Sequence, residues 1–225
     1  MDLTKNRLSR RVTLYFVGMF SYACGACLST KAALGLTPIT SISYVLSLYT
    51  QWSLGTVMLT YNVVVLILER LLYGRIFQRK NYLQLPLSVV FSGFIDVCMY
   101  LFRTLDGADI LPRIGFFTLA LALMGLGVGG MMCGDFIPLP AEGLVKALSF
   151  RFQLEFGRAK MGHDCVIVAL TAVLSLVLLR RLEGIQVGTV VAALLLGPIS
   201  RMWIKGIRRF ILPEPAIENV VSAQS

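Results

Sequence analysis

The stretch LGLTPITSISYVLS, residues 34–47, lies between two apolar segments that are each long enough to cross a membrane. It opens with glycine, threonine and proline and continues with a short helical pattern over about residues 38–48. Proline is tolerated in the first turn of a helix because the N–H that it lacks would have no partner there. Gly35 permits a tight turn, and Thr37 can cap the helix. The stretch therefore predicts a short helix whose positive dipole end points into the protein.

The composition is that of a membrane protein with several spans. Of the 225 residues, 56% are hydrophobic and only 15% are charged, and the mean hydropathy is +0.76. Soluble domains carry more charge than this. The net charge of +9 comes from Lys and Arg residues near the ends of apolar segments, where they anchor cytoplasmic loops. We therefore expect the lipid bilayer as a partner and no nucleic acid.

Six apolar segments are long enough for helices that cross the bilayer, whose core of ~30 Å needs about 20 residues. They comprise residues 12–30, 54–72, 85–102, 114–134, 156–179 and 187–204. The first follows three arginines, but it is longer than the apolar core of a signal peptide. We interpret it as a retained first helix.

Two further segments resemble each other and are too short to cross. One is the quoted stretch, and the other is FIPLPAEGLVKALSF, residues 136–150, with its helical part from about residue 140. About a dozen helical residues at ~1.5 Å each reach only half of the bilayer core. Because irregular backbone at membrane depth must be buried or hydrated, these segments are expected to line the protein interior.

Aligning Pro38 with Pro140 indicates an internal duplication with an offset of 102 residues. Without a gap, the same offset aligns Gly25 with Gly127, Ser47 with Ser149, Gln51 with Gln153, Gly55 with Gly157, Tyr61 with His163 and Asn62 with Asp164. GFID at 93–96 also resembles GPIS at 197–200 if two residues are inserted. We expect an all-α fold of two repeats, 1–105 and 106–206, and a short cytoplasmic tail at 207–225. Each repeat would hold three transmembrane helices and a proline-headed half-helix.

The basic residues favour one of two arrangements. If both short segments cross fully, there are eight spans and the halves are parallel; if each enters and leaves on one side, there are six spans and the halves are inverted. With a cytoplasmic N-terminus, six spans place the basic clusters at 7–11, 70–80, 151–160 and 205–209 inside, and only Arg180 and Arg181 disagree. Eight spans would expose one of the first two clusters outside. The positive-inside bias favours six spans and two cytoplasmic termini, with fully spanning short segments as the alternative.

Two half-helix N-termini near mid-depth would suit a polar or anionic group. The candidate substrate-binding residues lie at these N-termini or in the next span: Thr37, Pro38, Thr40, Pro140, Glu142 and Asn62. Ionisable side chains inside a span are costly unless paired or hydrated, so the candidates for proton or ion coupling are Asp164, His163 and Asp96. Structural roles are the alternatives: helix capping by Glu142, a hydrogen bond between spans for Asn62, and buried pairing for the aspartates.

The cysteines point to packing rather than to a cofactor. All five, Cys24, Cys27, Cys98, Cys133 and Cys165, lie in apolar segments, and their number is odd. A disulfide framework is therefore not expected. The C-x-x-C at 24–27 leaves a soft-metal site as a weak alternative to the close packing of small residues. The sequence contains no HExxH, nucleophile elbow or nucleotide loop, so we expect no cofactor, no metal site and no enzyme.

Three of these stretches together resemble the YitT/YczE-like family of bacterial membrane proteins. They are LGLTPITSISYVLS, the GFID segment, and VGTVVAALLLGPI at 187–199. Members typically carry an LGTSP-like stretch near the start and a G-x-GT…G-P stretch near the end, which maps onto Gly188, Thr189, Gly197 and Pro198. Gln186 replaces the first glycine of that pattern. The resemblance implies a protein of the bacterial inner membrane and supplies no substrate or mechanism.

The function that these features favour is a small secondary transporter or channel-like carrier for a small polar or anionic solute. The chain has no nucleotide-binding element, so a proton or ion gradient would supply the energy. A membrane scaffold or accessory protein without transport is the alternative, and self-association into a homo-oligomer is left open. A transporter should have a polar cavity at mid-depth, whereas a scaffold should have a closed core.

Overall fold

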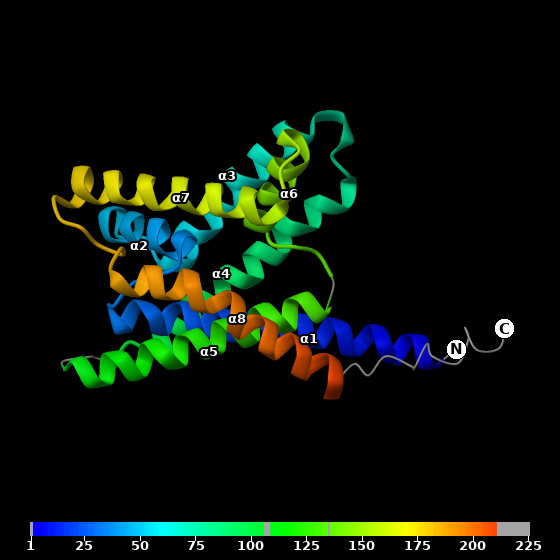
Figure 1. Ribbon diagram of the computed structural model, residues 1–225, viewed down its shortest axis with the longest axis horizontal. Coiled ribbons are helices and arrows are strands. Elements are labelled where there is room, and N and C mark those ends of the chain that lie inside the picture. The colour runs from blue at the N-terminus through cyan, green and yellow to red at the C-terminus, as the bar shows by residue number, and fades with distance from the viewer. Residues whose placement is uncertain (1, 106–108, 135, 211–225) are drawn as a thin grey trace.

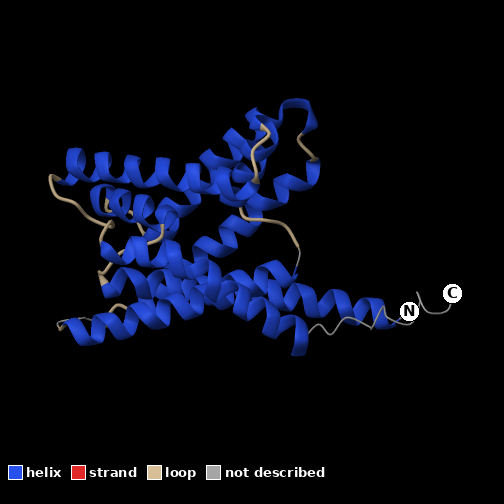
Figure 2. Ribbon diagram, in the orientation of Figure 1, coloured by secondary structure: helices blue, strands red, loops and turns tan. Residues whose placement is uncertain are grey.

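The computed structural model describes residues 2–105, 109–134 and 136–210, and within them the chain is helical with no strand (Figures 1 and 2). The first half consists of α1 (Asp2–Ala32), α2 (Pro38–Thr50), α3 (Leu54–Tyr73), the short turns η1 (Gly74–Ile76) and η2 (Arg79–Leu83), and α4 (Gln84–Leu101). The second half consists of α5 (Ile110–Gly134), α6 (Pro140–Phe152), α7 (Phe156–Leu174), its continuation η3 (Ser175–Leu179), and α8 (Val187–Phe210).

Six helices of the described chain are long and apolar enough to cross a membrane, which confirms the predicted number. They comprise Ser9–Ala32, Leu54–Ile76, Arg79–Leu101, Ile110–Gly134, Phe156–Leu179 and Val187–Arg209. The third span differs most from its predicted bounds. It begins at Arg79 rather than at residue 85, because η2 leads directly into α4.

The helical part of the second repeat ends later than its predicted boundary at residue 206. α8 runs to Phe210, past the predicted start of the tail at 207. Residue 106, where the second repeat is predicted to begin, lies outside the described residues, as do residues 211–225 of the tail.

The two short helices agree in length, in their first-turn proline and in the way they end. α2 and α6 each have 13 residues, and their bounds differ by the predicted offset. Each has proline in its first turn and an extended residue before it, Thr37 (φ −65°, ψ 154°) in one case and Leu139 (φ −66°, ψ 155°) in the other. Each ends on a glutamine with positive φ, Gln51 or Gln153, whose amide donates to a carbonyl three residues back. Both halves therefore follow the order long, short, long, long.

The helices form two layers joined by α4. In Figure 1, α1, α5 and α8 lie together below, while α2, α3, α6 and α7 lie above, and α4 runs obliquely from one layer to the other. α1 packs most extensively against α5, and α5 packs against α8. In the upper layer α2 contacts α7, and α6 contacts α3. The start of α1 and the end of α8 lie at the same end of the molecule.

Glycines allow α1 and α5 to approach until their backbones touch. A Cβ at Gly25 would lie 2.7 Å from the Ala120 carbonyl oxygen, and one at Gly127 would lie 2.6 Å from the Tyr22 backbone nitrogen. Contacts of Gly18 with Gly130 at the other end of the pair show that the two helices run antiparallel. Helices in lipid commonly associate through small residues that let their backbones approach closely. Van der Waals packing drives this association, because moving an apolar surface from lipid to protein gives no hydrophobic gain.

The stretch that opens the chain's first short helix is held by the start of α8. The Gly188 N–H donates to the Leu34 carbonyl at 2.7 Å, and the Leu36 N–H donates to Thr189 Oγ1 at 3.2 Å. Gly35 has φ +138°, and a Cβ there would collide with the backbone of Gly188 and Thr189. The two motifs that the sequence singled out are therefore in direct contact.

Candidate functional site

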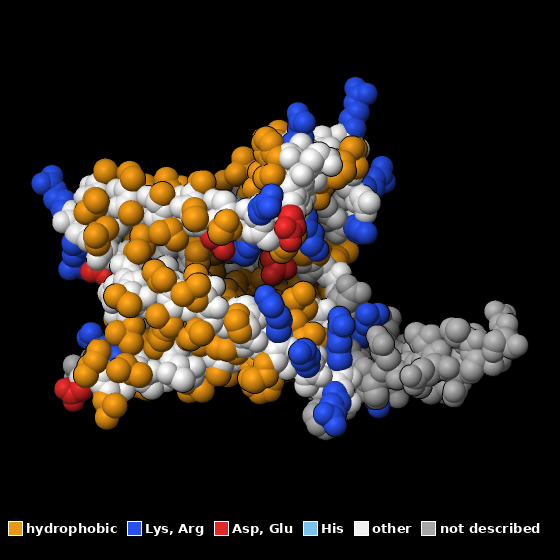
Figure 3. All heavy atoms as spheres, viewed as in Figure 1, with side chains coloured by type: hydrophobic (Ala, Val, Ile, Leu, Met, Phe, Trp, Pro, Cys, Tyr) orange, Lys and Arg blue, Asp and Glu red, His pale blue; other side chains and the backbone are white. Residues whose placement is uncertain are grey.

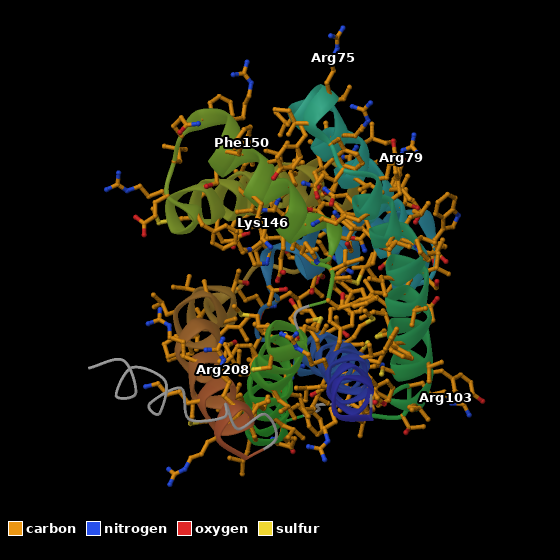
Figure 4. The ribbon with its side chains drawn as sticks, turned by 90° about the vertical axis from the view of Figure 1, so that its right-hand side faces the viewer. Arg75, Arg79, Arg103, Lys146, Phe150 and Arg208 are labelled. Carbon is orange, nitrogen blue, oxygen red and sulfur yellow. The ribbon has the colours of Figure 1, made fainter. Side chains whose placement is uncertain are left out.

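A hollow lies between the two layers, at the end of the molecule where α1 begins. Two adjoining cavities of about 400 and 310 Å³ share a wall formed by Phe136, Ile137 and Pro138, and Lys146 lines both. Figure 3 shows acidic and basic side chains gathered at this hollow. In Figure 4, Lys146 belongs to the upper layer and Arg208 to the lower layer, on either side of the opening. Polar side chains, among them Glu69, Asn81, Gln84 and Lys146, line the larger of these cavities.

A buried carboxylate that the sequence reading missed borders the larger cavity. Glu69, near the end of α3, is 1% exposed. It accepts hydrogen bonds from Asn81 Nδ2 at 3.0 Å and from Gln84 Nε2 at 3.0 and 3.2 Å. Gly143 of α6 lies against this carboxylate, and a larger residue there would force the Glu69 side chain to shift. The signal was present in the sequence as one acid in the apolar run LILERLL, but the basic residues beside it suggested a loop.

Glu142, one of the predicted substrate-binding residues, borders the smaller cavity. It lies in the first turn of α6 and shares the cavity lining with Lys146 and Tyr15. Burial raises the pKa of Glu142, and the charges of Lys146 and Lys160 oppose that rise. The Tyr15 hydroxyl donates to the Ile137 carbonyl at 2.6 Å and so fixes the extended segment before α6.

Asp164 and His163 meet, although consecutive helix residues diverge by about 100°. Asp164 forms an ion pair with Lys160 at 2.6 Å, and His163 Nδ1 lies 3.0 Å from the same carboxylate. His163 Nε2 lies 3.5 Å from the Tyr61 hydroxyl of α3. These side chains form a polar chain across α3 and α7, with Asp164 and Lys160 partly exposed.

Asp96 lies apart from the other candidates. Its carboxylate accepts from Ser53 Oγ at 2.9 Å and from the Gly55 N–H at 2.8 Å. These groups begin α3, so Asp96 caps that helix from the neighbouring α4. Asp96 lies in the C-terminal part of α4, which ends at Leu101. Its contacts fit the structural alternative.

The remaining candidates lie at the N-termini of the short helices or close to them. Thr37 and Thr40 are buried at the start of α2, with their hydroxyls 2.9 Å apart. Pro38 and Pro140 each occupy the first helical position, as predicted. Asn62 is buried on α3 beside Tyr61. Tyr22 of α1 lies within electrostatic range of Thr37 and Glu142, at the two helix starts.

The cysteines of the first half gather between α1 and α4. Cys24 Sγ lies 3.2 Å from Cys98 Sγ, and Cys27 Sγ donates to the Ile95 carbonyl at 3.3 Å. All described cysteines are free thiols. In the residues that the structure describes, no group of three or more His, Cys, Asp or Glu side chains is arranged to hold a metal ion.

Six apolar helices and a polar hollow define the chain as a helical, multi-pass membrane protein. It belongs to the family described as "Family of unknown function (DUF6198)", whose model matches residues 9–205. No curated protein and no solved structure matches it. The matching family does not carry the YitT/YczE name, so that resemblance stays a prediction.

Proposed function

We propose that this protein is a small secondary transporter of the bacterial inner membrane, built from two inverted repeats, that carries a small polar or anionic solute. The observation that carries the proposal is a difference between the halves. α3 packs closely against α4, whereas their counterparts α7 and α8 hardly meet. In a transporter of inverted repeats, two such unequal conformations can exchange and expose the site alternately to each side.

Reciprocal contacts support the inverted relation of the repeats. Gly25 contacts Met124, and their partners under the offset of 102, Gly127 and Tyr22, contact each other in the same way. Ser41 of α2 lies 3.4 Å from Thr171 of α7. The corresponding residues of the other half, Gly143 and Glu69, are also in contact. Such exchange of partners is what a pseudo-two-fold axis produces.

Two contacts support a position for this axis. The Ser21 hydroxyl donates to the Leu123 carbonyl at 2.9 Å, and the Tyr61 hydroxyl meets His163. In both cases a residue touches its own counterpart, 102 positions later, as only residues near a two-fold axis can. Because α1 and its counterpart α5 run antiparallel, an axis through these points would lie in the membrane plane.

The unequal conformations can be traced to particular residues. A Cβ at Gly55 would collide with the Ser92 carbonyl and Asp96 of α4, so α3 begins in tight contact with α4. At its counterpart Gly157, no atom of the described chain lies within 4 Å of such a Cβ. Asp96 caps α3, whereas Ser200, which takes its place in the second half, bonds within α8 to the Leu196 carbonyl. The start of α3 is therefore held against α4, whereas in the described chain the start of α7 is not held against α8.

The charges support an orientation in the membrane and a negatively charged solute. Lys and Arg gather at the end of the molecule that holds the hollow (Figure 3). By the positive-inside rule this end is cytoplasmic, together with both termini, and α2 and α6 are re-entrant. Lys146 lines both cavities, and the positive N-terminus of α6 faces the smaller one, which suits a solute with a negative group.

Thiol cross-linking tests the proposed exchange. We expect that Gly157→Cys paired with Ser200→Cys, in a chain with Cys165→Ser, forms an intramolecular cross-link in native membranes, because α7 closes onto α8 in the opposite state. Each single cysteine is one control. Gly157→Cys with Leu194→Cys is another, since Leu194 is 69% exposed on another face of α8. A scaffold with one closed conformation would give no Gly157–Ser200 product above these controls.

A further inference from the structure

The carboxylate of Glu69 has partners of an unusual kind for a buried acid. Both side chains that bond to it, Asn81 and Gln84, are neutral amides. Gln84 is itself only 1% exposed, and it is the first residue of α4. An ionised carboxylate buried in a protein is usually paired with a cation, as Asp164 is with Lys160 here. Among the described residues no cation forms a hydrogen bond with Glu69, so the ionised form of its carboxyl group is not stabilised by an ion pair as that of Asp164 is.

Gln84 also carries an unsatisfied atom at the same place. Its Oε1 is buried and has no hydrogen-bond partner among the described residues. It faces Gly143, where a Cβ would lie 3.0 Å from it. A buried amide oxygen without a donor is costly, so its presence calls for a second arrangement in which it is satisfied.

An amide can serve both protonation states of a carboxyl group, because rotation exchanges its donor and its acceptor. When Glu69 is ionised, Gln84 Nε2 donates to it, as observed. When Glu69 is protonated, its O–H is a donor, and a Gln84 turned by half a rotation presents Oε1 as the acceptor. A lysine or arginine partner has only donors and could not make this exchange.

We propose that Glu69 is a proton-binding site, with Gln84 as an amide switch that turns over when Glu69 takes up a proton. The proton comes from a hydronium ion in the adjoining cavity of about 400 Å³. One O–H bond of the hydronium breaks, a water molecule is left, and a new O–H bond forms at one carboxylate oxygen of Glu69. If the protein is the transporter proposed above, this is the proton that couples the cycle.

The charges around the site link proton uptake to binding of an anion. The charged groups that line this cavity are Glu69 itself, Lys146 from α6 and Lys80 from η2; Tyr73 of α3 also faces it. Lys146 acts electrostatically on Glu69. Neutralising Glu69 leaves both lysines without its opposing charge, so the cavity becomes more positive. A proton and a negatively charged solute should thus favour each other's binding.

Infrared difference spectroscopy of the purified full-length protein in lipid nanodiscs tests the site without any solute. On acidification, the wild type should gain a carbonyl band of a protonated carboxyl group in a buried, hydrogen-bonded environment. Glu69→Gln should lose this band, and Asp164→Asn should keep it. A band that persists in Glu69→Gln, or no such band in the wild type at any pH where the protein stays folded, would overturn the proposal.

Loss of the band in Glu69→Gln could also result from impaired folding, so a second variant is needed. Gln84→Leu leaves Glu69 in place but removes the amide, so the band should remain, with a shifted frequency and a shifted titration midpoint. An unchanged band in Gln84→Leu would exclude the switch. The measurement concerns proton binding alone, so its failure would leave the transport proposal intact, and failed cross-linking between α7 and α8 would leave the proton site intact.

Discussion

Glu69 and Asp164 are both carboxylates on spanning helices, yet their partners differ in kind. Asp164 lies beside Lys160 and His163, and both it and Lys160 remain partly exposed. Glu69 is 1% exposed, and its hydrogen-bond partners are amides. The sequence drew attention to Asp164 because of its depth in the span. Depth is readable from sequence, whereas the identity of the neighbours is not, since they come from other turns and other helices.

Replacement of Asp164 tests whether water reaches the partly exposed Asp164–Lys160 pair. We expect Asp164→Asn to lower the free energy of unfolding by at most about 1 kcal/mol, because a hydrated Lys160 loses little with its partner. Thermal melting of the detergent-solubilised protein measures this, with Lys160→Met and the double variant completing a cycle. A loss of several kcal/mol would mean that lipid rather than water surrounds Lys160.

Asp96 was a candidate for proton or ion coupling, and its contacts in the fold fit the structural alternative. Its position in an apolar segment suggested a functional charge, but in the fold it accepts bonds from Ser53 and Gly55. The sequence could not reveal this contact, because it depends on how α3 and α4 cross. In contrast, Pro38 and Pro140 were correctly placed, since proline at the first helical position is a local preference.

At the scale of elements, local sequence was sufficient for the number of long helices and the bounds of the short ones. Their hydrophobic length and their proline and glutamine ends are properties of contiguous residues. The packing of α4 against α3, and the absence of a comparable contact between α7 and α8, was not predictable. The two halves share a pattern, and the difference between them lies in tertiary contacts.

The glycine contact between α1 and α5 can be tested with a matched pair on one helix. We expect Gly127→Ala to destabilise the protein by roughly 1–3 kcal/mol, because its Cβ would lie 2.6 Å from the Tyr22 backbone. Gly115→Ala, where no described atom lies within 4 Å, should be neutral or stabilise the helix by up to about 1 kcal/mol. Equal effects of the two changes on thermal melting would show that α1 and α5 do not pack as described.

At the scale of the whole molecule, two layers enclose a hollow that opens where α7 and α8 separate. α4 joins the layers in the first half, while α8 stays with the lower layer in the second (Figure 1). Charge follows the same division, with Lys and Arg concentrated at one end (Figure 3). The proposed inverted relation of the repeats would link these features, because it would place equivalent parts of the two halves on opposite sides of the membrane.

Thiol labelling at two equivalent turns tests that relation most directly. Trp52 follows α2 and Leu154 follows α6; they correspond under the offset of 102, and both are exposed. In a chain with Cys165→Ser, we predict that Trp52→Cys reacts with a membrane-impermeant reagent added outside intact cells, and that Leu154→Cys reacts only after the cells are opened. Reaction of both from the same side would contradict inverted repeats and support eight spans in parallel halves.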